Sequence, residues 1–263
     1  MPSLVDRDNR STPIETALQH RGAVLIVLVA IPAAAWTWIA LMARDMYGSM
    51  QGASAWMMST VWDFPRIVLL WTMWAVMMTA MMLPSAAPLI LLYASALRRT
   101  TPERATSRIY ALTGGYLFVW ALFSAAATAL QRALSKALVL TPMIEPATPL
   151  AAAIVLAIAG VYQLTPLKRA CLRACRSPLG FMMSRPREGL AGAIRLGIDH
   201  GFYCLGCCWA LMLILFAGGV MNLAVIVALT VWVLVEKIAP LGEWTASVSG
   251  AALLALAVWI VVR

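Results

Sequence analysis

The stretch GFYCLGCCWALMLILFAGG, residues 201–219, joins an apolar run to three cysteines in its first half. It contains no charged residue, which is typical of a helix that crosses a bilayer or lies in a protein core. Gly218, Gly219 and the nearby Asn222 predict a tight turn directly after it. The stretch therefore predicts a buried helix that carries thiols and ends in a sharp reversal.

Similar apolar runs occur along the rest of the 263-residue chain, which is 62% hydrophobic and 12% charged. Soluble domains contain about 25% charged residues, and about 20 apolar residues are enough to span a bilayer. Pro84 and Pro88 predict a kink or break in the second run. The sequence predicts an all-α, polytopic transmembrane helical bundle with about seven spans, at residues 22–42, 66–93, 109–130, 149–167, 195–217, 220–238 and 245–262.

Basic residues orient the predicted bundle, because cytoplasmic loops collect Lys and Arg. Three arginines lie in the N-terminal tail, four after the second span, seven Lys and Arg after the fourth, and Lys237 after the sixth. Five basic residues remain for the other side. The sequence thus predicts a cytoplasmic tail at residues 1–21, a single transmembrane helical domain at residues 22–263, and an N-in, C-out orientation.

The formal net charge of +9 fits this topology. No aromatic platform accompanies the basic residues, so nucleic acid is not an expected partner and the lipid bilayer is. The chain also lacks a Ser-His-Asp order, an HExxH motif, a Gly-rich phosphate loop and a pair of neighbouring carboxylates. No catalytic residue is predicted.

Four polar residues lie within or at the ends of predicted spans. Glu236 and Lys237 end the sixth span and are expected to pair across the bundle or to reach the interface. Tyr162 and Gln163 end an apolar run, where they are expected to form hydrogen bonds between helices or to support metal ligands.

All five cysteines of the chain fall in two short motifs, CLRAC with Cys171 and Cys175, and CLGCC with Cys204, Cys207 and Cys208. Residues three or four apart share one face of a helix, so each motif presents a pair of thiols. Basic residues around the first motif would favour the thiolate form, which is the form that binds metals.

Small residues favour a close helix contact near the second motif. Gly197 and Gly201 lie on nearly the same helical face as Cys204 and Cys208. Glycines at this spacing let a neighbouring backbone approach, and a second thiol pair could then meet the first across the interface.

These thiols predict a soft-metal site, with Cu(I) favoured over Zn(II). Two thiolates suit Cu(I), whereas four suit Zn(II) or an iron–sulfur cluster. His200, one turn before Cys204, is a further candidate ligand, although it can equally cap or hydrogen-bond near the interface. Ten of sixteen methionines lie between Met42 and Met82, and among them Met77 and Met81 rank as lower candidates. Methionine also fills gaps between helices beside a proline kink.

Three functions fit these features. The first is metal handling, by delivery, sensing or translocation, with a metal chaperone or another membrane subunit as partner. The second is a membrane dithiol/disulfide oxidoreductase that cycles Cys204 and Cys207. The third is a non-catalytic membrane subunit or scaffold in which the cysteines only pack.

Three stretches of the chain are similar to the signatures of a bacterial family: WTMWAVMMTAMMLPSAAP (71–88), YQLTPLKRACLRACRSPLGF (162–181) and GIDHGFYCLGCCWALMLILFAGGVMNL (197–223), followed by Glu236 and Lys237. Over about residues 65–240 the chain resembles the predicted metal-binding integral membrane proteins, a domain family of unknown function. The resemblance implies a metal-binding, multi-pass protein of the bacterial inner membrane, and it names neither the metal nor an activity.

Overall fold

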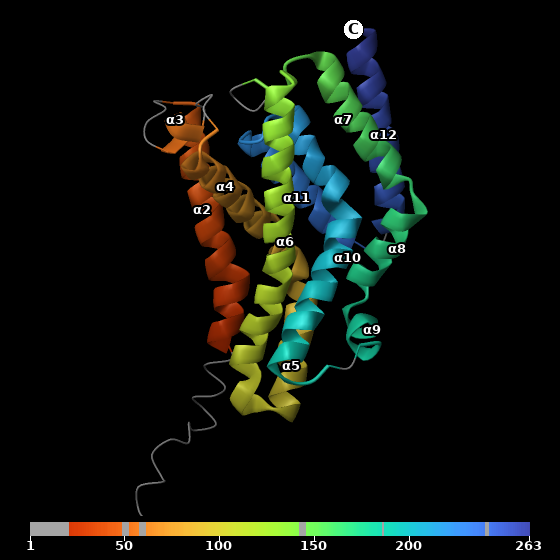
Figure 1. Ribbon diagram of the computed structural model, residues 1–263. Helices are drawn as coiled ribbons and strands as arrows, with labels where there is room; N and C mark the ends of the chain where they lie inside the picture. The colour runs from red at the N-terminus through yellow and green to blue at the C-terminus, as the bar shows by residue number, and fades with distance from the viewer. Residues whose placement is uncertain (1–20, 49–52, 58–61, 142–145, 186, 240–241) are drawn as a thin grey trace, which may run out of the picture.

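The structure, a computed structural model, is a bundle of helices that stand side by side (Figure 1). It describes residues 21–48, 53–57, 62–141, 146–185, 187–239 and 242–263. Residues 1–20, which make up almost all of the predicted cytoplasmic tail, lie outside the described residues.

The regular elements of the described residues are helical, which confirms the predicted all-α class. The longer helices are α2 (Ile31–Met46), α4 (Phe64–Met82), α5 (Ala87–Thr100), α6 (Ala105–Lys136), α7 (Pro149–Gln163), α8 (Pro166–Arg176), α10 (Gly189–Gly218), α11 (Leu223–Ile238) and α12 (Gly242–Val262). The shorter elements are η2 (Ile26–Ala30), α3 (Ala53–Met57), η3 (Pro84–Ala86), η4 (Pro102–Arg104) and α9 (Pro178–Met183).

Capping residues set where several helices begin. The side chains of Asp63, Thr148, Thr165 and Asn222 each accept a hydrogen bond from a backbone N–H in the first turn of α4, α7, α8 and α11. A proline follows three of these caps, where its missing N–H leaves no helical hydrogen bond unmade. Gly219, with a φ of +87°, completes the predicted tight turn between α10 and α11.

The predicted break in the second apolar run is confirmed at Pro84, where α4 gives way to the short 3-10 helix η3. The backbone N–H of Ala86 donates to Leu83 instead of to Met82. The carbonyl of Met82 is then free to accept hydrogen bonds from Ser85 at 2.7 Å and from Tyr116 at 2.9 Å. The break therefore ties the end of α4 to α6.

All seven predicted apolar segments overlap helices, but not all of these helices are long enough to cross a bilayer. In the described ranges, five helices are long and apolar enough, or six if α7 and α8 form one span bent by 66°. Helix α11, the sixth predicted segment, has 16 residues, which is about 24 Å of helix against a hydrocarbon core of about 30 Å. The number of seven spans and the orientation stay predictions.

Helices α6 and α10 run closely side by side (Figure 1). A Cβ atom at Gly197 would lie 2.0 Å from the carbonyl oxygen of Leu112, and one at Gly115 would lie 2.2 Å from that of Ile194. This confirms the predicted close approach of a backbone at Gly197. The neighbour is α6, however, and not the helix that carries the first cysteine motif, because α8 packs on a different face of α10.

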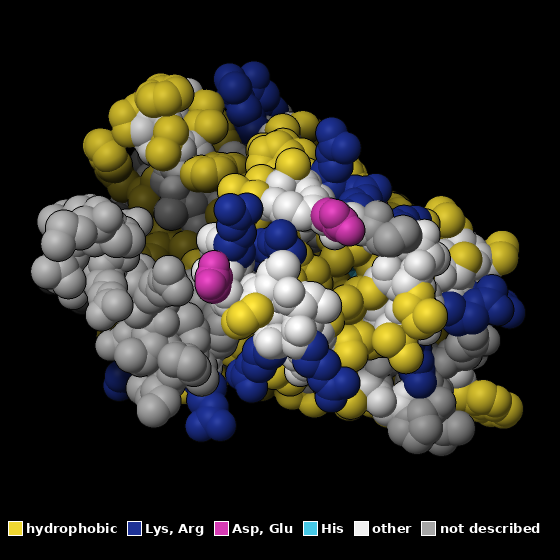
Figure 2. All heavy atoms as spheres, turned by 90° about the horizontal axis from the view of Figure 1, so that it is seen from below, with side chains coloured by type: hydrophobic (Ala, Val, Ile, Leu, Met, Phe, Trp, Pro, Cys, Tyr) yellow, Lys and Arg dark blue, Asp and Glu magenta, His cyan; other side chains and the backbone are white. Residues whose placement is uncertain are grey.

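Basic side chains gather at one end of the bundle. Figure 2 views the molecule from the lower end of Figure 1 and shows Lys and Arg side chains around that face. Exposed members are Arg98 and Arg99 at the end of α5, Arg104 in η4, and Arg187 and Arg195 near the start of α10. This is the end that the loop charges predict to be cytoplasmic.

Two neighbouring glycines of α6 provide a test of the close packing. Gly115→Ala places a methyl group against the α10 backbone and should destabilise the protein by about 1–3 kcal/mol. Gly114→Ala is the matched control, because a Cβ at Gly114 meets nothing within 4 Å and alanine favours a helix. Thermal unfolding of both variants in mild detergent measures the difference. Equal midpoints would contradict the described contact.

Candidate metal centre

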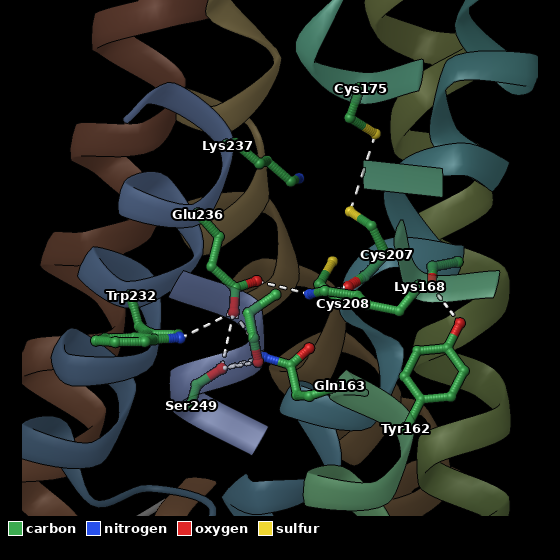
Figure 3. Close-up of polar contacts among 12 residues, drawn as sticks. Tyr162, Gln163, Lys168, Cys175, Cys207, Cys208, Trp232, Glu236, Lys237 and Ser249 are labelled. Carbon is green, nitrogen blue, oxygen red and sulfur yellow. Dashed lines mark hydrogen bonds and ion pairs between the residues drawn. The ribbon is translucent and has the colours of Figure 1, made fainter. Parts of the chain in front are cut away.

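The two cysteine motifs meet where α8 packs against α10. All five cysteines are free thiols, and Cys204, Cys207 and Cys208 are at most 1% exposed. The Sγ atoms of Cys207 on α10 and Cys175 on α8 are 3.9 Å apart (Figure 3). One thiol from each motif thus forms a direct contact.

The other cysteine of α8, Cys171, packs against the backbone of α10. A Cβ atom at Gly206 would lie 2.7 Å from the Sγ of Cys171, so only glycine lets α8 come this close. Two further hydrogen bonds hold the contact, because Tyr162 donates to the Gly206 carbonyl and Lys168 to that of Cys207. Tyr162 therefore links helices, which was one of its two expected roles.

Cys204 lies at the centre of the polar contacts. Its Sγ is 2.9 Å from the Nζ of Lys237 on α11 and 3.0 Å from the hydroxyl of Tyr116 on α6. Its backbone carbonyl accepts hydrogen bonds from the thiols of Cys207 at 3.1 Å and Cys208 at 2.8 Å. Lys237 is 8% exposed, and its ammonium group places a positive charge against the Cys204 sulfur.

Cys208 faces a methionine instead of another cysteine. Its Sγ is 3.8 Å from the Sδ of Met82, the last residue of α4. Met77 and Met81, the predicted lower-ranked ligands, are buried in the same helix at 1% and 0% exposure. Sequence reasoning missed Met82, although its place just before Pro84 was a usable signal, since the helix end turns toward α6 and α10 there.

His200 lies one turn below Cys204 on α10 and is 4% exposed. Its ring centroid is 5.8 Å from that of Tyr116 and 5.4 Å from that of Phe181, with the second pair edge to face. Its Nδ1 atom has no hydrogen-bond partner among the described residues. A buried imidazole nitrogen without a partner is free to bind a ligand, which keeps His200 as a candidate.

A buried ion pair between Lys168 and Glu236 lies next to the contact between Cys175 and Cys207. The Nζ of Lys168 and the Oε2 of Glu236 are 2.6 Å apart, with side chains 0% and 2% exposed. The carboxylate also accepts hydrogen bonds from Gln163 at 2.6 Å, Trp232 at 3.0 Å and Ser249 at 3.2 Å (Figure 3). Glu236 therefore pairs across the bundle, as one of the two expectations had it, and its partner is Lys168.

The thiols of Cys175 and Cys207 can bind one metal ion through two sulfur ligands. Over the residues that the structure describes, no group of three or more His, Cys, Asp or Glu side chains is arranged to hold a metal ion. Two metal–thiolate bonds of about 2.3 Å reach at most about 4.6 Å, so the 3.9 Å between Cys175 and Cys207 suits one ion. Two thiolates are a ligand set for Cu(I), whereas zinc sites use four ligands.

A double-mutant cycle tests the buried ion pair. Lys168→Met and Glu236→Gln each leave one buried charge without its partner and should each cost about 3–5 kcal/mol of stability. The double variant removes both charges and should be no less stable than either single variant. Unfolding in detergent gives the four free energies. Additive losses would show that the two side chains do not stabilise each other.

Comparison with known proteins agrees with a role in copper chemistry. Residues 71–260, more than two thirds of the chain and a range that holds all five cysteines, match the PpoB2 family, described as copper chaperone. No curated protein and no solved structure matches the chain. The chain belongs to the PpoB2 copper chaperone family.

Proposed function

We propose that this protein is a multi-pass membrane protein that binds Cu(I) at the thiols of α8 and α10 and delivers it to an acceptor protein. The observation that carries the proposal is the 3.9 Å contact between Cys175 and Cys207. Membership in a copper chaperone family names the metal that this pair would hold. Delivery requires ligands that bind copper and release it, which a two-sulfur site allows.

The surface of the bundle supports the membrane location. Leu150, Ile154, Ile158 and Val161 form a stripe along α7 and are 46–58% exposed. Lipid accepts such an apolar surface, whereas water does not. We place the protein in the bacterial inner membrane with the basic end of Figure 2 toward the cytoplasm, because Lys and Arg collect there.

Lys237 supports Cu(I) as the ion. Two thiolates and one Cu(I) carry a net charge of −1, and the ammonium group of Lys237 lies 2.9 Å from the Sγ of Cys204. A buried negative charge requires such a cation close by.

Metal content tests the proposed pair. We expect about one Cu(I) per chain in protein purified in mild detergent under reducing conditions, as measured by mass spectrometry. Cys175→Ser or Cys207→Ser should abolish it, because a single thiolate at the site binds copper too weakly to survive purification. Cys171→Ser is the matched control on the same helix and should retain copper.

Two outcomes would contradict the copper proposal. Unchanged copper in both serine variants would exclude this pair as the site. A metal-free protein, even after Cu(I) is offered, with a Cys175–Cys207 disulfide that forms and reopens with the redox potential would instead favour a membrane dithiol/disulfide oxidoreductase. The same sulfur contact supports that second candidate function, because the two free thiols are neighbours from different helices.

Substitution of Lys237 tests the charge balance. Lys237→Met removes the cation beside Cys204 and should weaken Cu(I) binding about 10–100-fold, the usual effect of losing an outer partner of a metal site. Lys237→Arg keeps the charge and should retain most of the affinity. Competition with a coloured Cu(I) chelator measures both variants. Equal affinity in Lys237→Met and the unaltered protein would remove Lys237 from the proposed site.

A further inference from the structure

A second sulfur pair lies on the other side of the cysteine cluster. The Sγ of Cys208 on α10 is 3.8 Å from the Sδ of Met82 on α4, and the two residues are 1% and 0% exposed. Consecutive residues of a helix point about 100° apart. Cys207 and Cys208 therefore face different neighbours, and Figure 3 shows the Cys207 sulfur directed toward Cys175.

The ligand types of the two pairs differ in charge. A thioether is neutral and binds Cu(I) while binding almost no hard ion. One thiolate, one thioether and one Cu(I) are neutral in sum, whereas two thiolates and one Cu(I) carry −1. A neutral complex needs no further balancing charge when it is buried, so the Cys208–Met82 pair, at most 1% exposed, is suited to hold copper.

Cys204 connects the two pairs. The thiols of Cys207 and Cys208 both donate to its carbonyl oxygen, at 3.1 Å and 2.8 Å. Because both sulfurs lie against one oxygen atom, at 3.1 Å and 2.8 Å, they are at most about 5.9 Å apart.

We propose that Cys208 and Met82 form a second Cu(I) position that receives copper from Cys175 and Cys207 by ligand exchange. This inference rests on the proposed function. Copper stays Cu(I) and no electron moves. The bonds to Cys175 and Cys207 break as bonds to Cys208 and Met82 form, and the proton that Cys208 loses goes to the thiolate of Cys207, with which it shares an acceptor. Cys175 takes up a second proton from solvent.

Met82 also begins a buried series of thioethers. Met73, Met77, Met78, Met81 and Met82 of α4 are all at most 1% exposed. The series leads from the sulfur cluster along α4, away from the basic end of the bundle (Figure 1). The second position therefore lies where this series of thioethers meets the cysteines.

Anaerobic titration of the reduced full-length protein with Cu(I), against a coloured Cu(I) chelator, tests the second position. We expect two equivalents in the unaltered protein. Met82→Leu and Cys208→Ser should each lose the second equivalent and keep the first, whereas Cys175→Ser should lose the first. Met221→Leu, at a buried methionine outside α4, is the control and should keep both. Exchange of Met for Leu costs under about 1.5 kcal/mol, so the fold is retained.

The outcomes separate this inference from the proposed function. One equivalent in the unaltered protein, unchanged in Met82→Leu, would overturn the second position and leave the first intact. Loss of an equivalent in Met221→Leu as well as in Met82→Leu would also overturn the assignment to Met82. No bound Cu(I) in the unaltered protein would overturn the proposed function, and the second position with it. X-ray absorption at two equivalents should report sulfur ligands only.

Discussion

The buried ion pair between Lys168 and Glu236 fixes how the helices around the thiols stand to one another. Its two charged atoms are 2.6 Å apart and both side chains are at most 2% exposed. Separation of α8 from α11 would leave two unpaired charges in an apolar interior, which costs several kcal/mol. The same ammonium group also donates to the carbonyl of Cys207. The 3.9 Å contact of Cys207 with Cys175 therefore depends on this pair, although neither charge touches a sulfur.

The opposite side of the cluster depends on glycine. The lack of side chains at Gly115 and Gly197 brings α6 and α10 into backbone contact, and this contact sets the position of Tyr116. The Tyr116 hydroxyl then reaches both Cys204 and the carbonyl of Met82. That carbonyl is available only because Pro84 breaks the helix after it. The position of Met82 beside the cysteines thus depends on Pro84, on the two glycines and on Tyr116.

The sequence predicted the features that depend on local chemistry and missed those that depend on contacts between helices. The helices, the break at Pro84 and the close approach at Gly197 follow from residue type and spacing. Lys168 was counted among loop cations. The Thr165–Pro166 pair marks the start of a new helix, but the 66° bend of α8 from α7 that turns this side chain inward depends on contacts between helices. Met77 and Met81 were likewise the predicted candidate ligands of α4, but the thioether that meets a thiol belongs to Met82.

Charge also bears on which ion the proposed site would select. Lys237 lies beside the cluster. Its positive charge, two thiolates and one Cu(I) sum to zero, whereas the same groups with Zn(II) would carry one buried positive charge. Such a charge is costly unless further anionic ligands join. No third Cys, His, Asp or Glu donor is in position within the described parts of the chain. A divalent ion would therefore require the cluster to rearrange or the lysine to lose its proton, and a monovalent ion requires neither.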